Sequence, residues 1–175
     1  MHSEEIINYK KNLYKYLDEN FKNLNLKHEL LRNINKILII KKKNMYLSKA
    51  NYSIFRIKYI QSIIKNSFFL LCIRNPNDVI NSSIKTHEKF EKIHSLNNFF
   101  SDEMTELCHF EFGSNRIGII ERSSCQNDYE YYLKHWIEIH DLILKKYLKM
   151  NNVYLINFDK FISDTKKTFF ELEKK

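Results

Sequence analysis

Two features of the sequence predict an α/β fold with a mainly parallel sheet flanked by helices. Short apolar runs alternate along the chain with longer segments whose apolar residues recur at helical spacing. The clearest run, residues 67–73 (SFFLLCI), lies between helical segments, which is typical of a buried central strand of a parallel sheet. The chain has 175 residues and no internal repeat or Pro/Gly-rich linker, so we expect one domain.

The elements can be assigned in order along the chain. Residues 1–36 are expected to form N-terminal helices, and residues 37–175 a sheet-and-helix core. The expected helices cover 4–24, 27–35, 52–65, 78–94, 98–109, 128–150 and 163–174, and the expected strands cover 37–40, 45–47, 67–73 and 153–158. The segment 110–127 holds both glycines and predicts a long surface loop.

The formal charge of +8 is concentrated in the first third of the chain. Residues 1–66 carry 14 Lys or Arg against 5 Asp or Glu, and residues 67–175 carry 15 against 16. A basic segment suits nucleic acid, an anionic membrane surface or an anionic substrate, whereas the ordinary alternative is a Lys-biased solvated surface. Arginine is scarce, and its planar fork suits bidentate anions, so each Arg is a candidate anion ligand.

The cysteines indicate a reduced setting. The three follow no metal-ligand or disulfide spacing, and Cys72 lies inside the apolar run, where we expect a buried thiol. No signal-peptide pattern occurs, and no apolar run approaches about 18 residues. We therefore expect a cytoplasmic protein without a membrane span. Histidine spacing suggests no metal site, and His87 and His109 are candidate bases.

The segment 68–87 (FFLLCIRNPNDVINSSIKTH) carries the strongest chemical signal. Arg74 closes the predicted strand, Pro76 turns the chain, and the following helix carries Ser82. Ligands of parallel sheets bind outside the carboxyl ends of the strands, and an Arg fork with a hydroxyl suits a phosphate monoester. The ordinary alternative is a surface Arg paired with Asp78 and an unremarkable helix serine.

This pattern, R-x-P-x-D-x-x-x-S after an apolar strand, resembles the 3′-phosphate-binding segment of the sulfotransferases that use 3′-phosphoadenosine 5′-phosphosulfate (PAPS). The resemblance implies that Arg74 and Ser82 bind the nucleotide's 3′-phosphate. It also implies a P-loop-like α/β fold and transfer of a sulfonate from PAPS, without a metal, to a hydroxyl or amine acceptor that the sequence does not identify.

Flanking segments extend the resemblance over residues 44–175. Upstream, Lys49 matches a basic residue near the transferring sulfonate. Downstream, three segments resemble the family's acceptor loop, its Trp-bearing helix and its terminal segment: EFGSN (111–115) with Gly118, DYEYYLKHWIEIHDLIL, and NVYLINFDKFISDTKKTFFELE. Trp136 in the second of these is expected to be a core residue.

The sequence also departs from the family's pattern. The Gly-bearing loop that binds the 5′-phosphosulfate is not found, and we expect it to lie upstream of Met1. Asn51 stands near the position where cytosolic members have a His base, and Asn157 and Asp159 replace a basic residue and a Glu. The alternatives are therefore a truncated or degenerate member without activity, or a basic nucleic-acid-binding protein.

Overall fold

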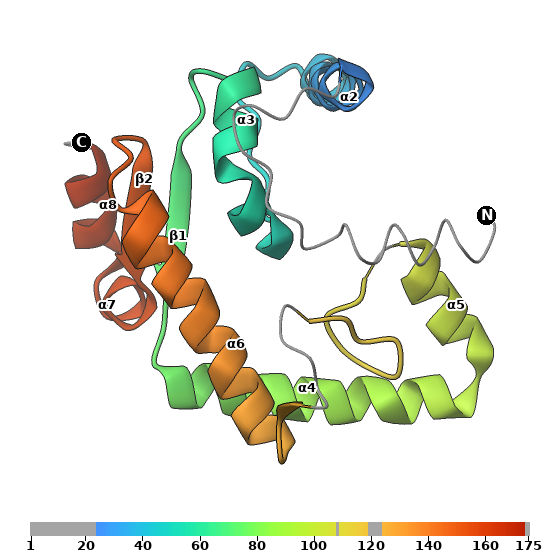
Figure 1. Cartoon of the computed structure of the whole chain (residues 1–175). Coiled ribbons are helices and arrows are strands. Elements are labelled where there is room, and N and C mark those ends of the chain that lie inside the picture. The colour runs from blue at the N-terminus through green and yellow to red at the C-terminus, as the bar shows by residue number, and fades with distance from the viewer. Residues whose placement is uncertain (1–23, 108, 119–123, 174–175) are drawn as a thin grey trace. The chain divides into compact units, whose positions relative to one another are not determined.

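The computed structural model describes residues 24–107, 109–118 and 124–173. It divides the chain into two compact units, Met1–Phe68 and Phe69–Lys175. Most described residues are helical, and the strands form one small parallel sheet (Figure 1). The predicted α/β class is confirmed at this level. The predicted helix over 4–24 falls almost wholly outside the described residues.

The first unit contains helices only, among its described residues. These are α2 (Leu24–Lys41), a 3-10 helix (Asn51–Arg56) and α3 (Ile57–Ile63). The last two confirm the helical segment that was expected over 52–65. Phe55, Ile57 and Tyr59 are buried in this unit.

The two strands predicted between residues 37 and 47 are wrong. The first lies inside α2, which ends in a Schellman motif: the N–H of Lys43 donates to Leu38 and the N–H of Lys42 donates to Ile39. Lys42 adopts the left-handed conformation, with φ of 50°, that glycine commonly takes at this position. Residues 45–47 form no regular element. A short apolar run such as 37–40 is compatible with helix or strand, because spacing alone does not distinguish them.

The second unit contains the sheet. Strands β1 (Phe69–Ile73) and β2 (Val153–Asn157) pair in parallel, with Phe69 opposite Val153 and Ile73 opposite Asn157. The helical elements of this unit are α4 (Pro76–Leu96), α5 (Asn98–Glu106), α6 (Asp128–Leu142), a π-helical turn (Ile143–Tyr147), α7 (Phe158–Ser163) and α8 (Thr165–Glu173). Both strands were thus predicted correctly, as were the helices expected over 78–94, 98–109, 128–150 and 163–174. The short helix α7 was not predicted.

The expectation that β1 is a buried central strand is wrong. Its side chains alternate between half-buried and exposed; Leu70 is 42% exposed, and Cys72, expected to be buried, is exposed. Among the described residues β1 pairs only with β2, so one face of the strand is not covered as it would be in a large parallel sheet.

The core of the second unit lies between α4 and α6, which cross each other (Figure 1). Ile80 is fully buried against Tyr131 and Tyr132, and four side chains pack around these three: Ile84, Phe112, Cys125 and Leu133. Trp136 is partly buried, and its ring stacks on His140 at 3.6 Å between centroids. Among the described residues, no helix combines the length and the apolar content that crossing a membrane requires.

Candidate anion-binding site

The β1–α4 junction places Arg74 at the carboxyl edge of the sheet. Arg74 directly follows β1, and Asn75 caps α4 because its side-chain oxygen accepts a hydrogen bond from the N–H of Asn77 at 2.9 Å. Pro76 occupies the first helical turn, where its missing N–H costs nothing. The predicted order of strand, turn and helix is confirmed, and it sets Arg74 beside the positive end of a helix.

Arg74 contacts residues from the helices that follow each of the two strands. Its guanidinium nitrogen lies 3.8 Å from the Asp78 carboxylate, and its guanidinium carbon lies 5.3 Å from the centre of the Phe158 ring. Phe158 begins α7 directly after β2, so the parallel pairing of the strands brings it to Arg74. The Arg74 side chain is 43% exposed and that of Asp78 is 54% exposed. An exposed ion pair at this spacing contributes at most about 0.5 kcal/mol.

Ser82 lies on the same face of α4 as Asp78. The two residues are four apart, so they occupy successive turns whose backbones are separated by about 6 Å along the helix axis. The Cα–Cβ bonds of a helix tilt toward its N-terminus, so the Cβ of Ser82 inclines toward the turn that holds Asp78. Ser82 is exposed. Asp78 therefore shares a helix face with Ser82 and pairs with Arg74, which precedes the helix.

Lys49, the third predicted site residue, is exposed and lies in the irregular segment that precedes the 3-10 helix. It belongs to the first unit, whereas Arg74 and Ser82 belong to the second. Neither unit by itself therefore holds all three residues.

A second polar cluster joins α4 to the segment 109–118, which folds back along that helix (Figure 1). The N–H of Gly113 donates to Nδ1 of His87 at 3.0 Å, and Nδ1 of His94 lies 3.0 Å from the hydroxyl of Ser114. His87 and His94 are 3% and 6% exposed. Because Nδ1 of His87 accepts a hydrogen bond, its Nε2 carries the proton and faces Glu91 at 3.3 Å. Both ring nitrogens of this candidate base are thus engaged, one with the loop and the other with Glu91 of its own helix.

Arg116 fixes the other end of this loop to α6. Its guanidinium donates to the Tyr132 hydroxyl at 3.0 Å and to Asp128 at 3.4 Å, and it lies 4.4 Å from the centre of the Tyr131 ring. Burial raises the pKa of Tyr132 to about 12, so the phenol stays a neutral partner. Arg116 therefore has a carboxylate partner inside the protein and serves the fold.

The other candidate base, His109, lines a hollow of about 180 Å³. Its neighbours there are Phe90, Met104, Glu111 and Phe112. The walls are mainly apolar, with one imidazole and one carboxyl group. Within the described ranges, no group of three or more His, Cys, Asp or Glu side chains is arranged to hold a metal ion.

Sequence reasoning named Arg74 and Ser82 and, in the ordinary alternative, the Arg74–Asp78 pair that the structure contains, but it did not name Phe158 or Tyr129. Phe158 is 84 positions from Arg74, and no local signal connects the two. Tyr129 of α6 donates to the side-chain oxygen of Asn77 at 3.0 Å, which fixes the start of α6 beside the start of α4. Only the parallel pairing and the crossing of the helices bring these residues together.

Comparisons with known proteins leave the family open. No family model matches the chain, and searches of curated proteins and of solved structures give no match. The fold defines an α/β protein with a small parallel sheet, and the sulfotransferase resemblance stays a prediction from the sequence.

Proposed function

We propose that the chain is a sulfotransferase-like domain that binds the 3′-phosphate of PAPS at the β1–α4 junction, in a P-loop-like fold. One observation carries the proposal: Arg74 lies at the carboxyl end of a parallel strand, and its ion-pair partner Asp78 shares a helix face with Ser82. An anion that displaces Asp78 from Arg74 would lie between a guanidinium, a hydroxyl and a helix N-terminus.

The donors at this junction suit a phosphate monoester. Arg74 supplies two parallel N–H groups, which match two phosphate oxygens, and Ser82 supplies a neutral donor for a third. The Phe158 ring lies 5.3 Å from the guanidinium carbon, a cation–π distance that adds a second contact to Arg74. Hydrogen bonds to a phosphate dianion are stronger than the exposed pair with Asp78, so the exchange of partners is favourable.

In the proposed reaction the acceptor oxygen or nitrogen attacks the sulfur of PAPS in line with the bond that breaks. A bond from the acceptor to sulfur forms, and the bond from sulfur to the phosphate oxygen breaks. The products are the sulfonated acceptor and adenosine 3′,5′-bisphosphate, and the acceptor's proton passes to a base. A cationic group is expected to neutralise charge that develops on the leaving phosphate oxygen, an electrostatic role that the sequence resemblance assigns to Lys49.

Nucleotide binding tests the proposal. Titration calorimetry compares adenosine 3′,5′-bisphosphate with adenosine 5′-monophosphate, because only the first carries the 3′-phosphate. We expect the bisphosphate to bind more tightly. Arg74→Gln is expected to weaken it by at least about tenfold, and Ser82→Ala by roughly fivefold, in line with charged and neutral hydrogen bonds. Neither substitution is expected to affect the monophosphate.

Arg32→Gln is the matched control, because it removes the same charge from an exposed helix in the other unit. Equal losses from Arg32→Gln and Arg74→Gln would indicate general charge attraction and contradict the proposed site. Transfer of labelled sulfonate from PAPS to a hydroxyl- or amine-bearing acceptor then distinguishes a catalytic domain from one that binds the nucleotide only. We expect little or no transfer by this chain alone.

A further inference from the structure

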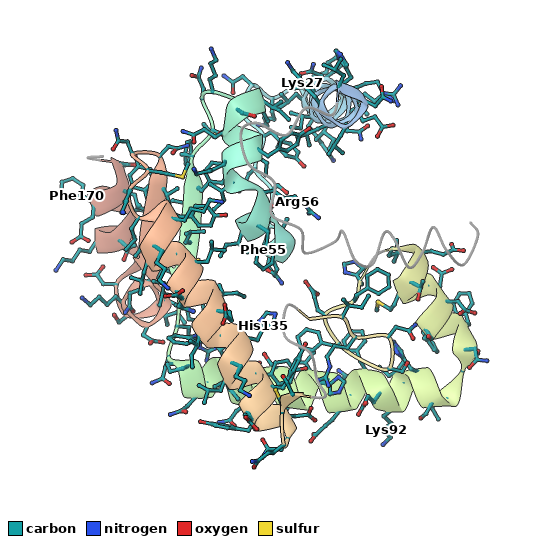
Figure 2. The ribbon with its side chains drawn as sticks, viewed as in Figure 1. Lys27, Phe55, Arg56, Lys92, His135 and Phe170 are labelled. Atoms are coloured by element: carbon teal, nitrogen blue, oxygen red, sulfur yellow. The ribbon has the colours of Figure 1, made fainter. Side chains whose placement is uncertain are left out.

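The segment Leu24–Leu47, which comprises α2 and the irregular stretch after it, is strongly basic and exposed. The segment contains six cationic residues and one carboxylate, Glu29, and all of these charged side chains are exposed. Figure 2 shows the side chains of α2, Lys27 among them, radiating from the helix. The cationic residues are Lys27, Arg32, Lys36, Lys41, Lys42 and Lys43. The segment therefore attracts an anionic partner.

The same segment exposes large apolar side chains on both sides of its lysine cluster. Ile39 and Ile40 precede Lys41–Lys43 and are 76% and 75% exposed, whereas Met45 and Leu47 follow it and are 70% and 86% exposed. No residue of α2 is buried. A solvated Lys-rich surface accounts for the charges but does not account for four exposed aliphatic side chains beside them.

The directions of these apolar side chains favour a lipid surface as the partner. At about 100° per residue, Ile39 lies roughly 200° and Ile40 roughly 300° around the helix from the exposed Ile37. A protein groove requires apolar residues along one stripe, and nucleic acid gains little from aliphatic contacts. A fluid acyl layer accepts apolar groups in any direction, and lysines can extend their ammonium groups to the headgroups above it.

We propose that this segment docks the chain on an anionic membrane surface. Ile39, Ile40, Met45 and Leu47 enter the boundary between headgroups and acyl chains, and Lys41–Lys43 contact the lipid phosphates and carboxylates. The contact is made by the C-terminal end of α2 and the irregular stretch after it, because these four exposed aliphatic side chains lie there. This interaction is independent of nucleotide binding at Arg74.

Sedimentation of the 175-residue chain with vesicles tests the proposal. We expect strong binding to phosphatidylcholine vesicles that contain about a third phosphatidylserine, and weak binding to phosphatidylcholine alone. The triple change Lys41→Gln, Lys42→Gln and Lys43→Gln is expected to weaken binding on the order of 100-fold, since each basic residue near the surface contributes roughly fivefold. The double change Ile39→Ser and Ile40→Ser is expected to weaken it at least about tenfold.

Matched controls remove similar groups elsewhere. Lys160, Lys166 and Lys167 are exposed, and changing them to Gln removes the same charge; Leu96→Ser with Leu107→Ser removes exposed aliphatic groups. We expect these controls to bind anionic vesicles within about twofold of the unchanged protein. All altered residues are exposed, so circular dichroism should be unchanged.

Four results would overturn the proposal. The first is equal binding to neutral and anionic vesicles, and the second is equal loss in the control variants. The third is tight binding to duplex DNA together with no binding to vesicles. If Ile39→Ser and Ile40→Ser left that DNA binding unaltered, nucleic acid would be the partner. Loss of a dimer on Ile39→Ser and Ile40→Ser, again without vesicle binding, would instead assign the apolar groups to self-association.

Discussion

Replacing Gly113 with Ala tests how the loop 109–118 is held on α4. A Cβ at this position would lie 2.5 Å from Cε1 and 2.7 Å from Nδ1 of the His94 ring, and the φ of +86° is disfavoured for residues with a side chain. The left-handed conformation costs an alanine about 1–2 kcal/mol. Displacing the buried imidazole adds about 1–3 kcal/mol. We therefore expect Gly113→Ala to lower the free energy of unfolding by about 2–5 kcal/mol.

Urea unfolding, followed by fluorescence, measures this loss. Trp136 is the chain's single tryptophan and lies on α6, which packs against α4, so its emission reports on this core. A double-mutant cycle with His94→Ala separates the two contributions. Without the ring, Gly113→Ala should cost only the conformational part, about 1–2 kcal/mol.

Two outcomes would contradict this reasoning. A loss below about 0.5 kcal/mol would mean that neither the φ angle nor the approach to His94 constrains the loop, because ordinary surface changes fall in that range. An equal loss in both backgrounds would mean that the ring does not oppose the new methyl group. Ser95→Ala, at an exposed position on the same helix, should have little effect and serves as the control.

Three further predictions concern α6 and the loop fixed to it. Burial lowers the pKa of His135 (Figure 2) to about 4, so the unfolded chain takes up a proton first as the pH falls. The free energy of unfolding should therefore be constant above about pH 6.5 and fall by about 3 kcal/mol toward pH 4. Urea titrations of His135→Gln should show that most of this fall is removed. Arg116→Lys removes the forked guanidinium that contacts Tyr132 and Asp128, and should lower the free energy of unfolding by at least about 1.5 kcal/mol. An unchanged midpoint of urea unfolding would refute the anchoring role of Arg116. Asn127 caps α6 through the N–H of Glu130 at 2.9 Å, so Asn127→Ala should cost about 1 kcal/mol while Asn127→Asp, which still accepts, should cost less than half of that.

The elements that were predicted correctly carry strong local signals. Asn75 and Pro76 mark the start of α4, and Asn127 with acidic residues in the next turn marks the start of α6. The run 67–73 and the run 153–158 are apolar, short and bounded by polar residues, and both are strands. In each case the information that selects the element lies within a few residues of it.

The errors concern properties that depend on distant parts of the chain. Residues 37–40 are apolar and β-branched, but they continue a helix whose end is set by backbone hydrogen bonds around Lys42. Cys72 was expected to be buried because its strand is apolar, yet burial depends on how many strands and helices cover that face. Likewise, the ring of Phe158 beside Arg74 follows from the register of two strands that are 84 residues apart.

The carboxylate of Asp78 connects the observed structure to the proposed nucleotide site. In the described structure it neutralises Arg74, so the site already holds an anion of its own. A 3′-phosphate must displace this carboxylate and then remain near it, and repulsion between exposed unit charges about 4 Å apart in water is about 1 kcal/mol. Asp78→Asn should therefore tighten binding of adenosine 3′,5′-bisphosphate by about fivefold or more at low salt, and by less at about 0.5 M salt, where screening is strong. Calorimetry at the two salt concentrations measures the difference. If Asp78→Asn instead weakened binding, the carboxylate would be positioning Arg74 for the nucleotide, and competition between the two anions would be refuted.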